Sequence, residues 1–153
     1  IFNIEKEMKD VNRFLSLGSY AIAGVSRDPK KFGQAMFRDL RKKGMDVVPV
    51  NPAAETIDGI KCYRTVSELP ASVRGVIFMT PKEETLSVAK EAITHGIKDL
   101  WIQQGAESKE TIAALEKEDV NLIHHQCIMM FWKADGIHSF HRFLKKIFGG
   151  LPS

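Results

Sequence analysis

At 153 residues the chain is long enough to bury one hydrophobic core, and its 44% hydrophobic and 27% charged residues are typical of a globular domain. A formal net charge of +3 is too small to indicate nucleic-acid binding, and no apolar run approaches the roughly 20 residues that a membrane span needs. The two cysteines, Cys62 and Cys127, form no CxxC pair, so neither a disulfide framework nor a cysteine zinc site is indicated. We therefore expect one cytoplasmic domain over residues 1–153 that binds neither nucleic acid nor membrane.

The first part of the chain predicts a helix, a strand and a second helix. Residues 1–17 place apolar side chains at helical spacing among charges, which predicts a leading helix. Residues 20–25 form an apolar run of strand length that breaks at Gly24 into a basic loop. The next helix pattern begins at Gln34 and stops at Gly44. This order is typical of a phosphate-binding turn, because a helix N-terminus offers unpaired N–H groups and the positive end of a dipole.

The basic loop itself supplies residues suited to anions. The candidate phosphate-binding residues of the loop are Gly24, Ser26, Arg27, Lys30, Lys31 and Gly33. The loop is not a G-x-G-x-x-G dinucleotide fingerprint, because its two glycines are too far apart and no third glycine has the right offset. The alternative is that the two lysines form a solvated surface turn, since adjacent charges at strand ends are usually exposed.

Four further apolar stretches of strand length follow. They are residues 46–51, 75–79, 99–102 and 120–123. Pro49 lies inside the first of them and cannot donate to a sheet ladder, so we expect a bulge or a locally unpaired stretch there.

The later helix starts carry capping signals. Thr80 is predicted to cap the helix after the third strand, with Pro81 at the first helical position. Ser108 is predicted to cap a helix over residues 108–117. Near the end of the chain, apolar residues recur at helical spacing and predict an amphipathic helix over residues 138–148.

Five apolar strands that alternate with helices predict an α/β, Rossmann-like domain of three layers. Its sheet has five parallel strands, or slightly more, with helices on both faces. Ligands of such sheets bind beyond the carboxyl ends of the strands, where the strand order reverses. The segments predicted to meet there are residues 24–33, 51–52, 80–81, 103–105 and the segment around Cys127.

The end of the second strand and the charge of the loop indicate which nucleotide is bound. In an NAD site an acidic residue usually ends that strand and binds the ribose hydroxyls. Here the strand ends at Asn51 and Pro52, so no carboxylate is available. The three cations of the loop exceed what one pyrophosphate requires, whereas coenzyme A carries a pyrophosphate and a 3′-phosphate. The charge therefore favours CoA.

Five motifs at the predicted strand ends resemble the small CoA-binding protein family, which is related to the CoA-binding domain of the succinyl-CoA synthetase alpha subunit. They are GVSRDPKKFG, VVPVNP, GVIFMTP, WIQQGA and the late Cys127, and the resemblance covers residues 11 to 133. It implies a Rossmann-like domain that binds CoA. We expect the chain to bind CoA or an acyl-CoA in a non-catalytic carrier or regulatory role. The catalytic histidine of the synthetase belongs to a second domain, so ligase chemistry is not implied.

The resemblance also implies a role for each site residue. The phosphates would lie against Ser26, Arg27, Lys30, Lys31, Phe32 and Gly33. The adenosine end would lie near Asn51 and Pro52, while Thr80, Pro81, Gln104 and Gly105 would line the pantetheine path. Cys127 would face the same cleft.

Two alternative functions stay open. A CoA-dependent transferase or thioester-handling enzyme would use Cys127 as nucleophile and His124 or His125 as base, although a small buried thiol is the commoner state of cysteine. A nicotinamide-nucleotide sensor is the second alternative. Metal binding is disfavoured, because neighbouring histidines on an extended segment point to opposite faces. We expect no catalytic and no metal site, and a homodimer or an unknown protein partner stays open.

Overall fold

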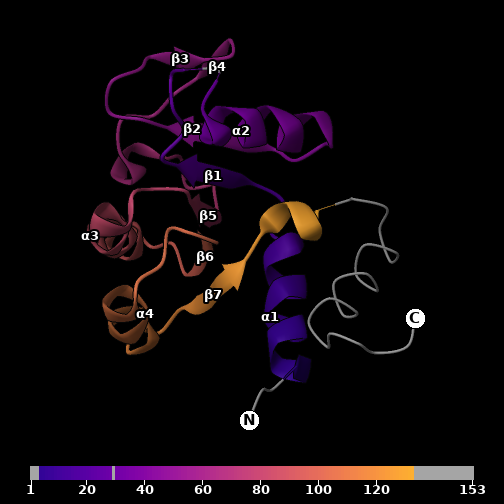
Figure 1. Ribbon diagram of the computed structural model, residues 1–153, viewed down its shortest axis with the longest axis vertical. Helices are drawn as coiled ribbons and strands as arrows, with labels where there is room; N and C mark the ends of the chain where they lie inside the picture. Colours follow the sequence, from indigo (N-terminus) through magenta and orange to yellow (C-terminus); the bar gives the residue numbers. More distant parts are fainter. Residues whose placement is uncertain (1–3, 29, 133–153) are drawn as a thin grey trace.

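The structure is a computed structural model that describes residues 4–28 and 30–132 (Figure 1). The helices are α1 (Ile4–Leu15), α2 (Phe32–Lys42), α3 (Lys82–Thr94) and α4 (Lys109–Glu116), and the 3-10 turns are η1 (Val66–Glu68) and η2 (Ile128–Met130). The strands are β1 (Tyr20–Ala23), β2 (Val47–Val50), β3 (Thr56–Ile57), β4 (Ile60–Lys61), β5 (Gly75–Phe78), β6 (Asp99–Gln103) and β7 (Asn121–Gln126). The amphipathic helix expected over residues 138–148 lies outside the described residues.

Five of the strands form one parallel sheet in the order β2-β1-β5-β6-β7. The chain passes from β2, on one side of β1, to β5 on the other side, so the strand order reverses between β1 and β5. In a sheet of this kind the ligand lies beyond the carboxyl ends of the strands at that reversal. The predicted α/β, Rossmann-like fold with a five-stranded parallel sheet is confirmed. Strands β3 and β4 form a separate antiparallel hairpin.

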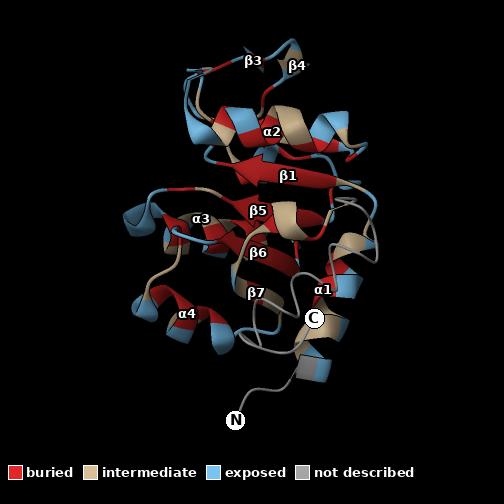
Figure 2. Ribbon diagram, turned by 45° about the vertical axis from the view of Figure 1, so that its right-hand side comes forward, coloured by how far each residue is buried: buried red, intermediate tan, exposed pale blue. Residues whose placement is uncertain are grey.

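Helices cover both faces of the sheet, and its three central strands, β1, β5 and β6, are buried (Figures 1 and 2). One hydrophobic cluster joins α1 and α2 to the sheet through Phe14 and Phe37. The other joins α3 and α4 to the opposite face through Ala89 and Leu115. All four residues of β1 are buried because alternate side chains of the strand enter the two clusters. A continuous apolar run is therefore what a central parallel strand requires.

Pro49 lies in β2 within a regular pairing, so the bulge or locally unpaired stretch predicted there is wrong. The register of β1 and β2 is regular, and Pro49 is opposite Ile22. β2 is an edge strand of the five-stranded sheet, and the carbonyl of Pro49 accepts from the backbone N–H of Tyr63 at 3.0 Å, on the side away from β1. The nitrogen of a strand residue points to the same side as its carbonyl, so the ladder with β1 needs no donor from this proline.

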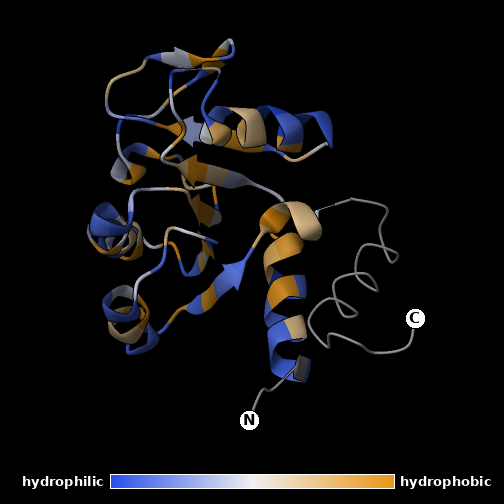
Figure 3. Ribbon diagram, viewed as in Figure 1, coloured by the Kyte–Doolittle hydropathy of each residue, from blue (hydrophilic) through white to orange (hydrophobic). Residues whose placement is uncertain are grey.

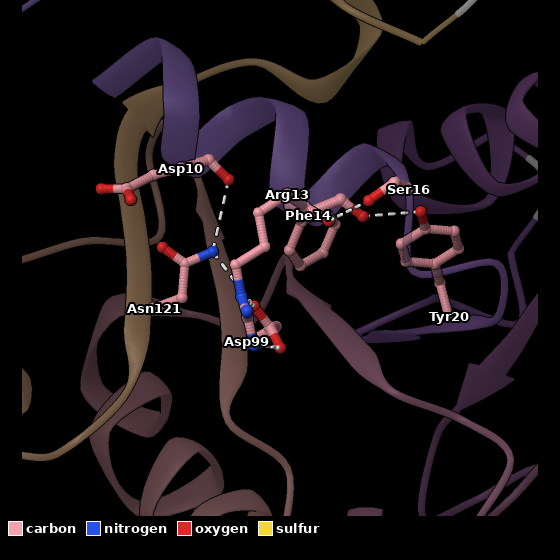
Figure 4. A network of polar contacts seen from close by, with 7 residues as sticks. All are labelled: Asp10, Arg13, Phe14, Ser16, Tyr20, Asp99 and Asn121. Atoms are coloured by element: carbon pink, nitrogen blue, oxygen red, sulfur yellow. Dashed lines mark hydrogen bonds and ion pairs between the residues drawn. The ribbon is translucent and has the colours of Figure 1, made fainter. Parts of the chain in front are cut away.

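Helix α1 is held to the sheet by a carboxylate at the start of β6 (Figure 4). Arg13 donates from Nε to Asp99 Oδ1 at 2.9 Å, and Asn121 Nδ2 donates to the same oxygen at 3.0 Å. Asn121 Nδ2 also lies 3.3 Å from the carbonyl oxygen of Asp10. The carboxyl half of α1, which includes Phe14, is the more hydrophobic half (Figure 3) and enters the core. Polar and apolar contacts thus act together to hold α1 on the sheet.

None of the helices in the described part of the chain is long and apolar enough to cross a membrane.

We predict that Asp99→Ala lowers the free energy of unfolding by about 2 kcal/mol, because bonds to a buried charged group are each worth about 1.5 to 3 kcal/mol and Arg13 is partly solvated. Asp99 is 4% exposed, which keeps water from replacing its partners. Urea denaturation measures the change. The control is Asp119→Ala, which removes an exposed ion pair with Lys98 at 3.8 Å and should change stability little. Equal effects of the two substitutions would contradict this account of α1.

Candidate functional site

The loop between β1 and α2, of which the structure describes residues 24–28, 30 and 31, forms what we call the first turn. Its first residue, Gly24, is packed against the end of β5. Gly24 has a φ of +96°, and a Cβ added to it would lie 2.7 Å from the backbone carbon and oxygen of Met79 and 2.8 Å from the nitrogen of Thr80. Backbone atoms cannot move aside as a flexible side chain can, so no other residue fits. The carboxyl ends of β1 and β5 therefore meet at the point where the strand order reverses.

The amino end of α2 lies directly on the first turn. A Cβ on Gly33 would lie 3.2 Å from the carbonyl oxygen of Gly24, so a larger residue would push the helix from the turn. The residue before the helix, Lys31, makes no side-chain capping hydrogen bond. The first N–H groups of a helix have no intrahelical partner, and the helix dipole is positive at this end. The arrangement suits an anion at the start of α2.

A buried amide that the sequence analysis missed supports the first turn. Gln34 is 6% exposed, and its Nε2 donates to the carbonyl oxygens of Ser26 and Arg27, each at 3.1 Å. From the sequence, Gln34 is predicted only to begin a helix. The available signal is that Gln34 is a polar residue in the same helical stripe as buried Phe37.

Asn51 ties the end of β2 to the same turn. Its Nδ2 donates to the carbonyl oxygen of Val25 at 2.7 Å, and its Oδ1 accepts from the backbone N–H of Ala53 at 2.7 Å. Both polar atoms of the side chain are therefore engaged within the protein. Pro52, the next residue, is exposed.

The cations predicted for the phosphates lie around the first turn and are exposed. Arg27, Lys30 and Lys31 take part in none of the ion pairs found among the described residues. The one carboxylate in the turn, on Asp28, accepts from the backbone N–H of Lys30 at 2.9 Å. Phe32 follows these residues as the first residue of α2 and is 59% exposed. The turn thus combines open N–H groups with positive charge.

Thr80 does not cap α3, and the capping prediction is wrong. The helix begins at Lys82, its N-cap is Pro81, and no side chain there makes a capping hydrogen bond. Thr80 is buried, and its Oγ1 lies 2.6 Å from Oγ1 of Thr85, which donates to the carbonyl oxygen of Ala106 at 2.8 Å. The Thr80 hydroxyl does not cap the helix because it forms a buried hydrogen bond with Thr85 of α3 instead. The two threonines join the end of β5 to α3 and to the turn after β6.

The turn after β6 presents Gln104 and Gly105, both exposed. Gly105 has a φ of +101°, which favours glycine, and its N–H donates to Oε1 of Glu107 at 3.0 Å. The backbone N–H of Gln104 donates to the carbonyl oxygen of Gln126 at 3.3 Å. This bond connects the end of β6 to the end of β7.

Cys127 lies directly after β7 and is half-buried. Its segment is held by Gln103, which is 5% exposed and whose Oε1 accepts from the backbone N–H of Ile128 at 3.1 Å. Trp101 Nε1 donates to the carbonyl oxygen of Gln126 at 3.1 Å. Two buried side chains of β6 therefore fix the backbone on either side of the thiol.

The neighbouring histidines of β7 do not point to opposite faces, so that prediction is wrong. Trp101 pairs with Ile123, and Gln103, two residues further along β6, pairs with Gln126. Gln126 lies three residues beyond Ile123, so β7 contains one more residue than β6 between the two pairs. The extra residue is a β-bulge, and His125 has a φ of 60°. A left-handed residue breaks the alternation of side chains, so Nδ1 of His124 lies 2.6 Å from Nδ1 of His125.

This contact does not amount to a metal centre. In the parts of the chain that the structure describes, no group of three or more His, Cys, Asp or Glu side chains could hold a metal ion. The pKa of His124 is lowered by burial and then by His125, while Glu116 and Glu107 oppose the change. A neutral His124 suits the contact, because one of the two facing nitrogens must accept the hydrogen bond.

The predicted site residues thus divide into two groups. The first turn meets Thr80 through the close approach at Gly24, and it meets Asn51 through the hydrogen bond to Val25. Gln104, Gly105 and Cys127 follow the ends of β6 and β7, further along the same edge of the parallel sheet.

A family model described as a CoA binding domain matches residues 18–133, and the chain belongs to this family. Among solved structures, the chain is similar to a conserved hypothetical protein from Pyrococcus furiosus. The two are 46% identical with a TM-score of 0.70, and the match covers 72% of this chain and 96% of that one.

Curated relatives are of two kinds. The chain is 30% identical over 126 residues to the alpha subunit of an ADP-forming acetate–CoA ligase II from Pyrococcus furiosus, a match that covers 75% of this chain and only 28% of the subunit. It is 24% identical over 108 residues to an uncharacterized protein of Bacillus subtilis, covering 71% of this chain and 80% of that protein. The chain is thus related both to small proteins and to a part of a ligase subunit.

We predict that acid destabilises the protein through His124. In the unfolded chain this histidine takes up a proton as the pH falls through about 6.5, whereas in the folded chain burial delays protonation. The unfolded state therefore binds more protons below that pH, and the free energy of unfolding falls as the pH is lowered towards the folded pKa. Urea denaturation between pH 7.5 and 5 should show a shallower loss for His124→Gln than for the wild type. Parallel curves for the two proteins would contradict the assignment.

Proposed function

We propose that the chain binds coenzyme A or an acyl-CoA at the carboxyl ends of its parallel strands, and that residues 1–153 form a single CoA-binding domain with a non-catalytic carrier or regulatory role. The observation that carries the proposal is the first turn. Arg27, Lys30 and Lys31 are exposed there, outside the ion pairs of the described residues, beside the open amino end of α2. Membership of the CoA-binding family supports this assignment.

The charge of the first turn suits the phosphates of CoA. In the proposed arrangement the pyrophosphate lies at the amino end of α2, where backbone N–H groups and the helix dipole favour an anion. The close packing at Gly24 and Gly33 supports this placement, because it holds the first turn against the end of β5 and the amino end of α2 against the first turn. The lysines then provide the additional positive charge that a 3′-phosphate requires.

The remaining site residues trace a path for the pantetheine arm. Thr80 and Pro81 follow β5, Gln104 and Gly105 follow β6, and Cys127 follows β7. From β1 to β7 there are three steps of about 4.8 Å between neighbouring strands, or roughly 14 Å in all. An extended pantetheine arm can bridge that distance and bring the thiol of CoA towards Cys127.

A nicotinamide dinucleotide fits the site less well. β2 ends at Asn51, whose amide is engaged by Val25 and Ala53, so the side chain is a poor substitute for the carboxylate that usually binds the ribose. The ligase activity in the name of the Pyrococcus furiosus subunit is not transferred either, because the chain spans only 28% of that subunit.

We predict that CoA binds more tightly than dephospho-CoA, and both more tightly than NAD. Replacing Lys30 and Lys31 together by Ala should weaken CoA binding by about tenfold or more, which corresponds to about 1.4 kcal/mol. The difference between CoA and dephospho-CoA should shrink in this variant, and it should also shrink with salt, because exposed charges are screened over about 8 Å at physiological ionic strength. Isothermal titration calorimetry measures the affinity of the protein for each of the three ligands.

The matched control replaces two exposed lysines away from the first turn, Lys90 and Lys117, by Ala and changes the net charge equally. This variant should retain the affinity of the wild type for CoA. If NAD bound with the same affinity as CoA, the proposal would be rejected in favour of the nicotinamide sensor.

We predict that Cys127 lies close enough to the end of the pantetheine arm to exchange with oxidised CoA. Its thiolate would attack one sulfur of the CoA disulfide, forming a protein–CoA disulfide and releasing one CoA thiolate. Cys62 serves as the internal control, because it is buried and burial raises the pKa of its thiol. Mass spectrometry after peptide digestion locates the adduct. An adduct on Cys62 alone, or none at all, would remove Cys127 from the site.

A further inference from the structure

We propose that Phe32 is the platform on which the adenine base of CoA stacks, and that it therefore determines how tightly the nucleotide end is held. This inference rests on the proposed CoA-binding function and assigns one contact within it.

Phe32 is an apolar residue that the fold itself leaves unused. Among the described residues it is the one exposed large hydrophobic side chain, with 59% of its surface accessible. A second phenylalanine in the same helix, Phe37, is fully buried against the sheet. Exposure of single apolar residues is common, so exposure alone does not indicate a binding role for Phe32. Its position in the fold does.

The position of Phe32 on α2 directs it to the carboxyl edge of the sheet. Residues four apart lie on the same side of a helix, and Phe32 precedes the buried residues Met36 and Leu40 by one and two turns. Those two pack on the sheet, so Phe32 continues the same apolar stripe by one turn, about 5.4 Å, towards the amino end of α2. That end lies on the first turn at the carboxyl end of β1. The stripe thus extends from the core into the proposed site.

The neighbours of Phe32 indicate which part of CoA meets its ring. Arg27, Lys30 and Lys31 precede it in the first turn and are exposed. In CoA the 3′-phosphate and the pyrophosphate are both attached to the ribose that carries adenine. A ligand whose phosphates are held by these cations therefore has its base within one nucleoside of them, beside an exposed aromatic ring.

The mode of recognition follows from the polar groups nearby. Asn51, at the end of β2, donates from Nδ2 to the carbonyl oxygen of Val25 and accepts at Oδ1 from the N–H of Ala53. Its side chain is therefore not left to form hydrogen bonds with the edge of the adenine base. The face of the base is then the part left to recognise. Stacking on an aromatic ring uses that face, contributes appreciably to the binding of each base and is tolerant of its edge substituents.

The test compares ligands with and without the base. Phe32→Ala should weaken CoA binding about tenfold, about 1.4 kcal/mol, and leave binding of 4′-phosphopantetheine, which lacks adenosine, unchanged. Phe32→Tyr should retain the affinity of the wild type, whereas Phe32→Leu, which is apolar but not aromatic, should resemble Phe32→Ala. CoA that carries 1,N6-ethenoadenine should bind the wild type as tightly as CoA, because only its edge is altered. Calorimetry provides the affinities, and thermal melts check that each variant is folded.

Two outcomes would overturn the inference while leaving CoA binding intact. One is that Phe32→Ala binds CoA as the wild type does. The other is that it loses affinity for CoA and 4′-phosphopantetheine equally, which would place the ring on the pantetheine arm or on the phosphate attached to it. Sedimentation of wild type and Phe32→Ala tests whether the ring instead joins two copies of the chain. A change in mass without a change in CoA affinity also overturns it. Failure of the wild type to bind CoA would reject the proposed function itself.

Discussion

The contact between Gly24 and the backbone of Met79 and Thr80 is the constraint on which the site depends. An added Cβ would lie as near as 2.7 Å to backbone atoms, so the ends of β1 and β5 can meet only because one residue has no side chain. Gly33 then lies against the carbonyl of Gly24, which places the amino end of α2 over the reversal of strand order. The anion-binding end of a helix is thereby fixed at the position where ligands of such sheets bind.

Two side-chain amides also hold the first turn in place. Gln34, from α2, and Asn51, from the end of β2, donate to three consecutive carbonyls of the first turn, those of residues 25, 26 and 27. The backbone of the turn is thus held from two sides by side chains of the protein itself. A loop that is ordered in advance loses less conformational entropy on binding, which raises affinity without an added contact.

Much of the fold could be predicted because it follows from local chemistry. The apolar runs located the five parallel strands, and Ser108 caps α4 as predicted, since its hydroxyl accepts from the N–H of Thr111 at 3.1 Å. Thr80 offered the same local signal but is turned inward by Thr85, five residues further along the chain. Capping propensity alone cannot distinguish the two cases, because the competing partner is determined by tertiary packing.

The site was only partly predictable for a similar reason. The glycines and cations of the first turn are evident in the sequence, but the role of Gln34 depends on which carbonyls lie beneath it in the folded chain. The histidines were misread because alternation holds only in a regular strand. A single inserted residue in β7, detectable only from its pairing with β6, reverses the expected direction of one ring.

The two outer strands of the sheet also bear on how the protein avoids aggregation. An exposed edge strand offers unpaired backbone groups to another chain, and proline, bulges and covering loops are known ways to prevent such pairing. β2 has Pro49 at its edge and is bridged there by Tyr63, whose backbone takes the hydrogen bonds that a foreign strand would need. β7 has the bulge at its histidines, which shifts the spacing of its backbone groups. Pro49 and the bulge thus make both edges poor templates for a second sheet.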